Sequence, residues 1–235
     1  MRWIALVVAM SVVAACGAPP QPAPKPTAPQ NGGTVTRLSV AQATSRLAPI
    51  KRRMEPIAER ECRARTKGTN CDFHISVDQR ANLPPNAFQS VDRNGRPQIT
   101  FTAALVSDAR NSDELAFVMG HEAAHHIMGH LNRQQADAMA GAIIVGILAS
   151  AAGANAATLD AAMDAGAMVG SRAYSKAYEL EADRLGTVIT KKSGYDPVNG
   201  AQYFTRIADP GNMFLGTHPP NNQRIQVVRQ TAAKM

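Results

Sequence analysis

The sequence predicts an α+β fold that is mainly helical and contains one small β-sheet. Long segments carry apolar residues at helical spacing, whereas three short segments between residues 73 and 101 have the composition of strands. The Asn94-Gly95 pair between the last two of these segments is a strong turn signal. The sequence has no internal repeat of solenoid length, and residues 36–235 suit a single domain with one core.

The N-terminus has the pattern of an export signal. Arg2 precedes an apolar run from Ile4 to Ala15, which is too short for a permanent membrane span and ends in small residues. The sequence Val13-Ala14-Ala15-Cys16 has the form of a bacterial lipobox, which predicts removal of residues 1–15 and lipidation of Cys16. Because Gly17 rather than Asp follows the cysteine, the analogy with lipoprotein sorting predicts the periplasmic face of the outer membrane.

Residues 16–35 are predicted to form a lipid-anchored tether. Six prolines lie between Pro19 and Pro29, mixed with Gln, Ala and one Lys. Such a composition favours the extended polyproline conformation and cannot build a packed core. The folded domain should therefore begin near Thr36 and include residues 36–235.

The first folded elements should be a helix followed by three strands. Residues 39–63 have helical periodicity, with interruptions expected at Pro49 and Pro56. Strands are expected at residues 73–77, 88–91 and 98–101. Since an exported chain meets an oxidising compartment, we expect Cys62 and Cys71 to form a disulfide.

The segment His121-Glu122-Ala123-Ala124-His125 predicts part of a zinc site. On a helix, residues four apart share a face, so His121 and His125 can direct imidazole nitrogens at one metal ion. Glu122 lies beside them as a candidate general base. A catalytic zinc takes three protein ligands and keeps a fourth position for water, whose pKa the metal lowers toward neutrality. The segment therefore predicts one Zn²⁺ per chain and a hydrolytic reaction.

Two helices should carry this site. The first should begin at Asn111 or Ser112, since either residue can cap it, and should run to about Leu131. The second should cover residues 175–192, and its end is marked by Lys191 and Lys192, with Gly194 two residues later.

The third metal ligand is expected on the second helix. His130 lies five positions after His125, well round the first helix, and is interpreted as a structural or surface residue. Glu179 offers a carboxylate, and Asp183 lies one turn further along the same face. Asp183 is thus placed to accept the free N–H of one ligand histidine. Glu181 lies on a different face and is expected to be solvated.

These motifs together resemble the M48 family of gluzincin metallopeptidases. The resemblance rests on HExxH at residues 121–125, ExxAD at residues 179–183, Gly194-Tyr195-Asp196-Pro197, and Thr217-His218-Pro219-Pro220 followed by Arg224. It implies a zincin-like domain with its sheet beside the HExxH helix, and Glu179 as the zinc ligand. It also implies that His218 binds the transition-state oxyanion or senses the metal, and that Arg224 orients neighbouring acidic groups.

The resemblance further implies a zinc metalloendopeptidase of the cell envelope. Its substrates would be misfolded or stalled envelope proteins, in proteolytic quality control, with a link to the outer-membrane assembly machinery. In this interpretation Glu122 is the general base and then the general acid, and His218 supports the oxyanion. The alternative is a lipoprotein chaperone or binding module whose zinc is closed by His218 as a fourth ligand.

Charge and composition argue against nucleic acid as a partner. The formal net charge is +7, but the basic residues are scattered and aromatic residues make up only 5% of the chain. Solvated surface charge is the simpler interpretation of this surplus.

The stretch from Ala138 to Leu159 has no charged side chain and is rich in Ala and Gly. Its hydropathy makes it a borderline candidate for a membrane span. However, one span between His125 and Glu179 would put two ligands of one zinc on opposite sides of a membrane. Packing within the domain is therefore favoured over membrane contact, and we expect the stretch to form a movable lid over the cleft.

Overall fold

The computed structural model describes residues 37–235, apart from residues 174, 210 and 212–217. The export signal (residues 1–15), Cys16, the rest of the tether, Thr36 and Thr217 therefore lie outside the described residues. The described residues belong to one compact unit, Val35–Met235. Their mainly helical α+β architecture with a small sheet confirms the predicted fold class.

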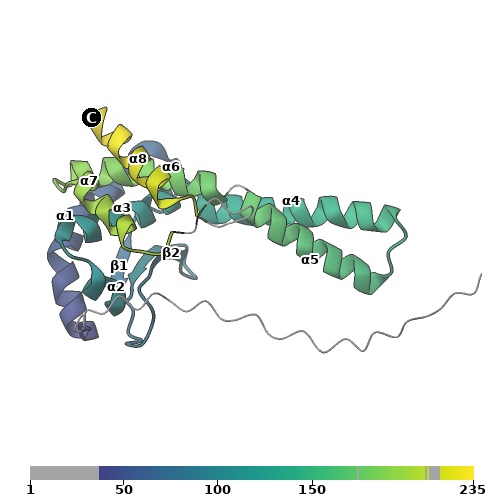
Figure 1. The fold of residues 1–235 in the computed structure, drawn as a ribbon, viewed down its shortest axis with the longest axis horizontal. Helices are drawn as coiled ribbons and strands as arrows, with labels where there is room; N and C mark the ends of the chain where they lie inside the picture. Colours follow the sequence, from purple (N-terminus) through teal and green to yellow (C-terminus); the bar gives the residue numbers. More distant parts are fainter. Residues whose placement is uncertain (1–36, 174, 210, 212–217) are drawn as a thin grey trace, which may run out of the picture. The chain divides into compact units, whose positions relative to one another are not determined.

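The elements follow one another along the chain as shown in Figure 1. The helices are α1 (Val40–Arg65), α2 (Ala103–Asp108), α3 (Ser112–Ile127), α4 (His130–Ala151), α5 (Ala156–Ala173), α6 (Ser175–Lys192), α7 (Pro197–Gly200), the 3₁₀ helix η1 (Ala201–Thr205) and α8 (Asn221–Ala233). The strands are β1 (His74–Val77), β2 (Ala87–Val91) and β3 (Pro97–Phe101).

The sheet places β2 at an edge. Its strand order is β1-β3-β2, with β1 parallel and β2 antiparallel to β3. The central strand β3 buries Ile99 and Phe101 completely, which anchors the sheet in the core. β2 contacts α3, the helix that carries HExxH. The sheet therefore lies beside this helix, as the resemblance implied.

The helix α1 is continuous, and the predicted interruptions at its prolines are wrong. Pro49 and Pro56 both lie inside the helix, and both are exposed. A proline removes one helical hydrogen bond, and on the solvent side water can bind the carbonyl that it frees. The opposite face is held by Leu47, Ile50 and Met54, which are buried in the core. Tertiary packing thus outweighs the local preference of the prolines.

A disulfide links the end of α1 to the segment before β1. It joins Cys62 and Cys71, and both side chains are buried in the main core. Closing this short loop in the unfolded chain contributes about 2–3 kcal/mol to stability.

The helices α3 and α6 approach each other through glycines. A Cβ atom at Gly186 would lie 2.9 Å from the backbone nitrogen of His121, and one at Gly120 would lie 2.8 Å from the carbonyl oxygen of Gly186. Only hydrogen fits at these positions, so the backbones pack against each other without intervening side chains. This close approach brings the side chains of α6 within reach of His121.

The HExxH helix ends earlier than the sequence predicts. It stops at Ile127, and Gly129 has a φ of 66° in the left-handed region. A residue in this conformation ends a helix, so α4 starts afresh at His130 in a new direction. The start of α3 and the whole of α6 agree with prediction, since Asn111 caps the former and the latter spans Ser175–Lys192.

The stretch 138–159 does not pack into the core, which contradicts the favoured prediction. It forms the distal part of a hairpin in which α4 and α5 pack on each other and extend away from the other described helices. None of residues 138–159 lines the cleft in the described chain, and the predicted movable lid stays a prediction. The prediction considered a single span, whereas the hairpin turns back, so that α4 contacts α3 and α5 contacts α6 at its two ends.

Candidate metal centre

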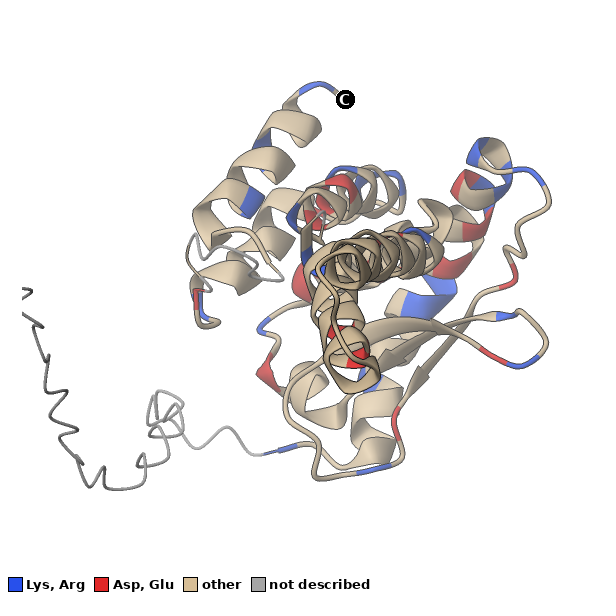
Figure 2. Ribbon diagram, turned by 90° about the vertical axis from the view of Figure 1, so that its right-hand side faces the viewer, with Lys and Arg blue, Asp and Glu red and all other residues tan. Residues whose placement is uncertain are grey.

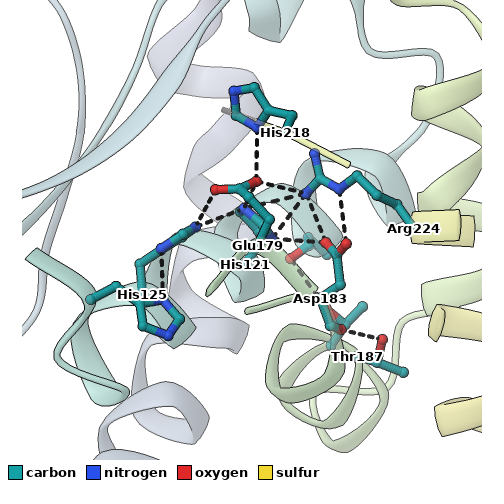
Figure 3. Close-up of polar contacts among 10 residues, drawn as sticks. His121, His125, Glu179, Asp183, Thr187, His218 and Arg224 are labelled. Atoms are coloured by element: carbon teal, nitrogen blue, oxygen red, sulfur yellow. Dashed lines mark hydrogen bonds and ion pairs between the residues drawn. The ribbon is translucent and has the colours of Figure 1, made fainter. Parts of the chain in front are cut away.

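Two histidines of α3 meet on the face that is turned toward α6. The Nε2 atoms of His121 and His125 lie 3.0 Å apart, and their ring centroids are 4.6 Å apart. Both come from one face because they are one helical turn apart. Figure 3 shows the two rings directed at the carboxylate of Glu179.

Glu179 completes a three-ligand group from α6. Its Oε1 lies 3.2 Å from Nε2 of His125, and its Oε2 lies 3.5 Å from Nε2 of His121. The donor atoms of all three residues lie within 4.8 Å of one another. Two imidazole nitrogens and one carboxylate are the ligand set of many catalytic zinc sites. The residues present therefore fit a zinc ion.

The carboxylate of Glu179 is held in its ionised form. Burial opposes ionisation, but hydrogen bonds from the surrounding histidines lower its pKa well below the ordinary value. An ionised carboxylate is the form that binds a metal.

A buried ion pair between Asp183 and Arg224 contacts the ring of His121 at Nδ1. Nδ1 of His121 lies 2.9 Å from Oδ1 of Asp183, and Arg224 donates two hydrogen bonds to Asp183, each of 2.8 Å. Burial opposes ionisation of Asp183, but Arg224 outweighs it and lowers the pKa. An ionised Asp183 accepts the Nδ1–H of His121 and leaves Nε2 free for a metal. Asp183 contacts His121 from α6, and Arg224 contacts Asp183 from α8.

His218 lies at the rim of the site. Its Nδ1 is 3.0 Å from Oε2 of Glu179, and its side chain is 52% exposed. The group of converging metal-binding atoms consists of His121, His125 and Glu179 and does not include His218. The histidine therefore contacts the ligand carboxylate from the solvent side.

Glu122 lies in a cleft of about 590 Å³ that also contains the three converging ligands. Burial raises the pKa of its carboxyl group, and the neighbouring His121 and His125 act in the opposite direction. The lining of the cleft also includes Ala87, Phe88 and Gln89 of the edge strand β2, which contacts α3. The cleft thus holds a carboxylate suited to general base catalysis beside an edge strand.

The sequence matches the model of peptidase family M48 over residues 44–232. The chain belongs to this family. It is also 35% identical over 151 residues to a putative beta-barrel assembly-enhancing protease of Vibrio cholerae serotype O1 (strain ATCC 39315 / El Tor Inaba N16961), covering 57% of this chain and 30% of that protein. The chain thus spans less than a third of this relative's length. Family membership confirms the expected family and assigns the chain to the metallopeptidases.

The M48 domain has a further histidine behind the site that sequence reasoning did not place there. Nδ1 of His130 lies 2.9 Å from Nδ1 of His125, and its Nε2 lies 3.2 Å from Oε2 of Glu181. Arg133 donates a 2.7 Å hydrogen bond to the same carboxylate oxygen. The ring of Tyr178 stacks on His130 with a centroid distance of 4.9 Å. Glu181 is therefore paired rather than simply solvated.

These contacts define which ring nitrogen carries the proton in His125 and in His130. Burial, aided by the neighbouring His125, lowers the pKa of His130 to about 4, so its ring is neutral at pH 7. A neutral His130 that donates from Nε2 to Glu181 must accept at Nδ1. It then receives the Nδ1–H of His125 and leaves Nε2 of His125 for a metal. The contact between His130 and His125 was not predicted because it depends on the turn at Gly129. This turn brings His130 back beside the candidate metal site.

Proposed function

We propose that this M48 peptidase is a zinc-dependent endopeptidase of the bacterial cell envelope that degrades misfolded or stalled envelope proteins. The observation that carries the proposal is the convergence of His121, His125 and Glu179 in a cleft that also contains Glu122. The lipobox ending at Cys16 supports the location. The name of the Vibrio cholerae relative, a beta-barrel assembly-enhancing protease, supports a link to outer-membrane assembly.

Each group in the site has its own role in peptide hydrolysis. Zinc, when bound, supplies Lewis-acid polarisation of the scissile carbonyl and activation of water. Glu122 takes the proton of the attacking water and delivers it to the leaving amine. Its raised pKa brings the carboxyl group closer to the working pH for both steps. His218 donates from the rim to the developing oxyanion.

The edge strand β2 is suited to bind protein substrates without a strict requirement for their amino-acid sequence. β2 lines the cleft and has a strand neighbour on one side only among the described residues. An extended peptide can add to such an edge through backbone hydrogen bonds, which do not depend on side-chain identity. Unfolded segments offer this backbone, whereas folded proteins have already paired theirs. The geometry therefore favours misfolded proteins as substrates.

Replacing the general base tests this proposal. The full chain should hydrolyse unfolded casein, and Glu122→Gln should keep its zinc but lose on the order of 10²–10⁴ in rate, because the amide cannot accept the proton. The control is Glu59→Gln, a substitution on α1 away from the cleft. Zinc content and casein cleavage are measured on all three chains. A near-wild-type rate in Glu122→Gln would refute the assigned base.

The proximity of His218 to Glu179 keeps a binding module as the second candidate. If His218 closes the metal as a fourth ligand, the wild type and Glu122→Gln should both contain zinc and neither should cleave casein. His218→Ala would then open the site.

The lipid anchor can be tested directly. Cells grown with labelled palmitate should incorporate the label into the wild-type chain, and Cys16→Ala should remove it entirely. A variant that still carries the label would contradict lipidation at this residue. The Cys62–Cys71 pair is enclosed in a disulfide and offers no competing thiol.

A further inference from the structure

The helices α4 and α5 meet through small residues. A Cβ atom at Gly141 would collide with the backbone of Gly166, and one at Gly170 would collide with the backbone of Asp137. Gly166 and Gly170 are four residues apart on one face of α5. This spacing lets two helix backbones pack closely, and it is typical of helix pairs in lipid.

The large apolar side chains of α4 point outward. Ile143 and Ile144 are 55% and 59% exposed, and Ile147 and Leu148 are both 64% exposed. Met139, one turn before Ile143, is 66% exposed. In a water-soluble hairpin the large apolar residues lie between the helices, where they leave water. Here the arrangement is reversed, with glycines inside and large side chains outside. We call these five residues the outer face of α4.

The outer face of α4 has no charge that would oppose contact with hydrocarbon. No Asp, Glu, Lys or Arg occurs between Ala138 and Leu159, and Figure 2 shows the hairpin, which faces the viewer, as mostly tan. Among the described residues, α4 alone is long and apolar enough to cross a membrane by length and composition. Protein interfaces commonly add Tyr, Trp or Arg to such a face, and the outer face has none of these.

Two acidic residues of α5 lie on the side of the hairpin that is turned away from α4. Asp164 precedes Gly166 by two residues, so it lies about 200° round α5 from the contact with α4. Ile143 follows Gly141 by two residues, so it lies about 200° round α4 from the contact with α5. The two side chains therefore point away from each other, one from each helix. Asp160 lies one turn from Asp164 and is also exposed. The side of α5 turned away from α4 therefore carries two exposed carboxylates together with the exposed Met168, and we call it the acidic side, whereas the outer face of α4 carries no charge.

We propose that the hairpin lies along a lipid membrane, with the outer face of α4 in the hydrocarbon boundary and the acidic side of α5 in water. An uncharged face matches an uncharged lipid phase, and an amphipathic element of this kind lies in the interface plane with its apolar side buried. Because the hairpin turns back to the domain, His125 and Glu179 remain on the same side of the membrane. This inference concerns the hairpin alone and does not depend on peptidase activity.

Tryptophan fluorescence with brominated lipids tests the proposal in the full chain. Trp3 is the only tryptophan, so Trp3→Phe gives a dark background. Into this background Ile147→Trp places a probe on the outer face of α4. Ala161→Trp places a matched probe on α5, where Ala161 is exposed and five residues from Gly166, turned away from α4. The packing of Gly146 on Met163 puts both probes at a similar level along the hairpin.

The two probes should behave differently in neutral phosphatidylcholine vesicles. Ile147→Trp should shift its emission to the blue and lose about half of its intensity to bromine on the acyl chains, while Ala161→Trp should change little. Quenching reports contact of the hairpin itself, so the result is independent of the anchor at Cys16.

Three results would overturn the proposal. If Ile147→Trp emits as in water and is not quenched, the hairpin does not touch lipid. If its emission is already blue without vesicles, rises with protein concentration and is not quenched by bromine, a second copy covers the face. If both probes are quenched equally, the hairpin does not lie with one side in water.

Discussion

Each ligand histidine is oriented by a partner of a different kind. His121 donates to a buried carboxylate, Asp183, which Arg224 holds in place with two hydrogen bonds. His125 instead contacts a neutral imidazole, His130, which Glu181 orients. Both arrangements fix the ring so that Nε2 faces the metal position. The ExxAD motif reveals the first partner, whereas the second depends on a turn that the motif does not describe.

Removing the partner of His125 should weaken metal binding. His130→Ala takes away the acceptor for Nδ1–H of His125, so its ring is no longer fixed, and we expect zinc affinity to fall roughly 10–100-fold. The matched control is His126→Ala, because His126 contacts the backbone of Asn70 and the ring of Phe73 instead. Competition with a zinc chelator measures the affinity of each chain. Equal affinity in the wild type and His130→Ala would show that His130 does not position His125.

At the scale of elements, prediction succeeded where local signals determine the outcome. The span of α6 followed from its terminal lysines and the glycine after them, and the cap of α3 followed from Asn111. Prediction failed where contacts between residues far apart in the sequence determine the structure. In α1, the face buried in the core keeps the helix continuous through Pro49 and Pro56. The prediction that residues 138–159 pack into the core failed for a related reason. Apolar periodicity shows that a helix face is hydrophobic, but it does not show what covers that face.

An ion pair between α1 and α6 should make stability depend on pH. Burial opposes ionisation of Glu61, but hydrogen bonds from Lys192 and Arg65 outweigh it and lower the pKa. A lowered pKa means that the stabilisation is complete above the ordinary value of 4.5 and is lost as pH falls through the folded-state pKa. The contribution should be about 1 kcal/mol, since Lys192 is partly exposed.

Urea unfolding of Glu61→Gln as a function of pH tests this pair. The variant should be less stable than the wild type at pH 7, and the difference should shrink as the pH falls from ~5 to ~3. Glu59→Gln, two residues earlier on the same helix, serves as the control. A difference that stays constant across this range would contradict the role of Glu61.

For the whole molecule, the fold brings the site together from three distant parts of the chain. α3 supplies His121, His125 and Glu122, α6 supplies Glu179 and Asp183, and α8 supplies Arg224. The glycine contact between α3 and α6 sets the distance between the first two parts. Motifs in the sequence name these residues, but only the folded chain shows that they converge in one cleft beside an edge strand.

The most direct test of the account is casein hydrolysis by the full chain before and after its metal is removed. Activity should disappear with a chelator and return when zinc is restored to one ion per chain, because His121, His125 and Glu179 converge as one candidate metal site. Hydrolysis that survives complete removal of metal would contradict the account.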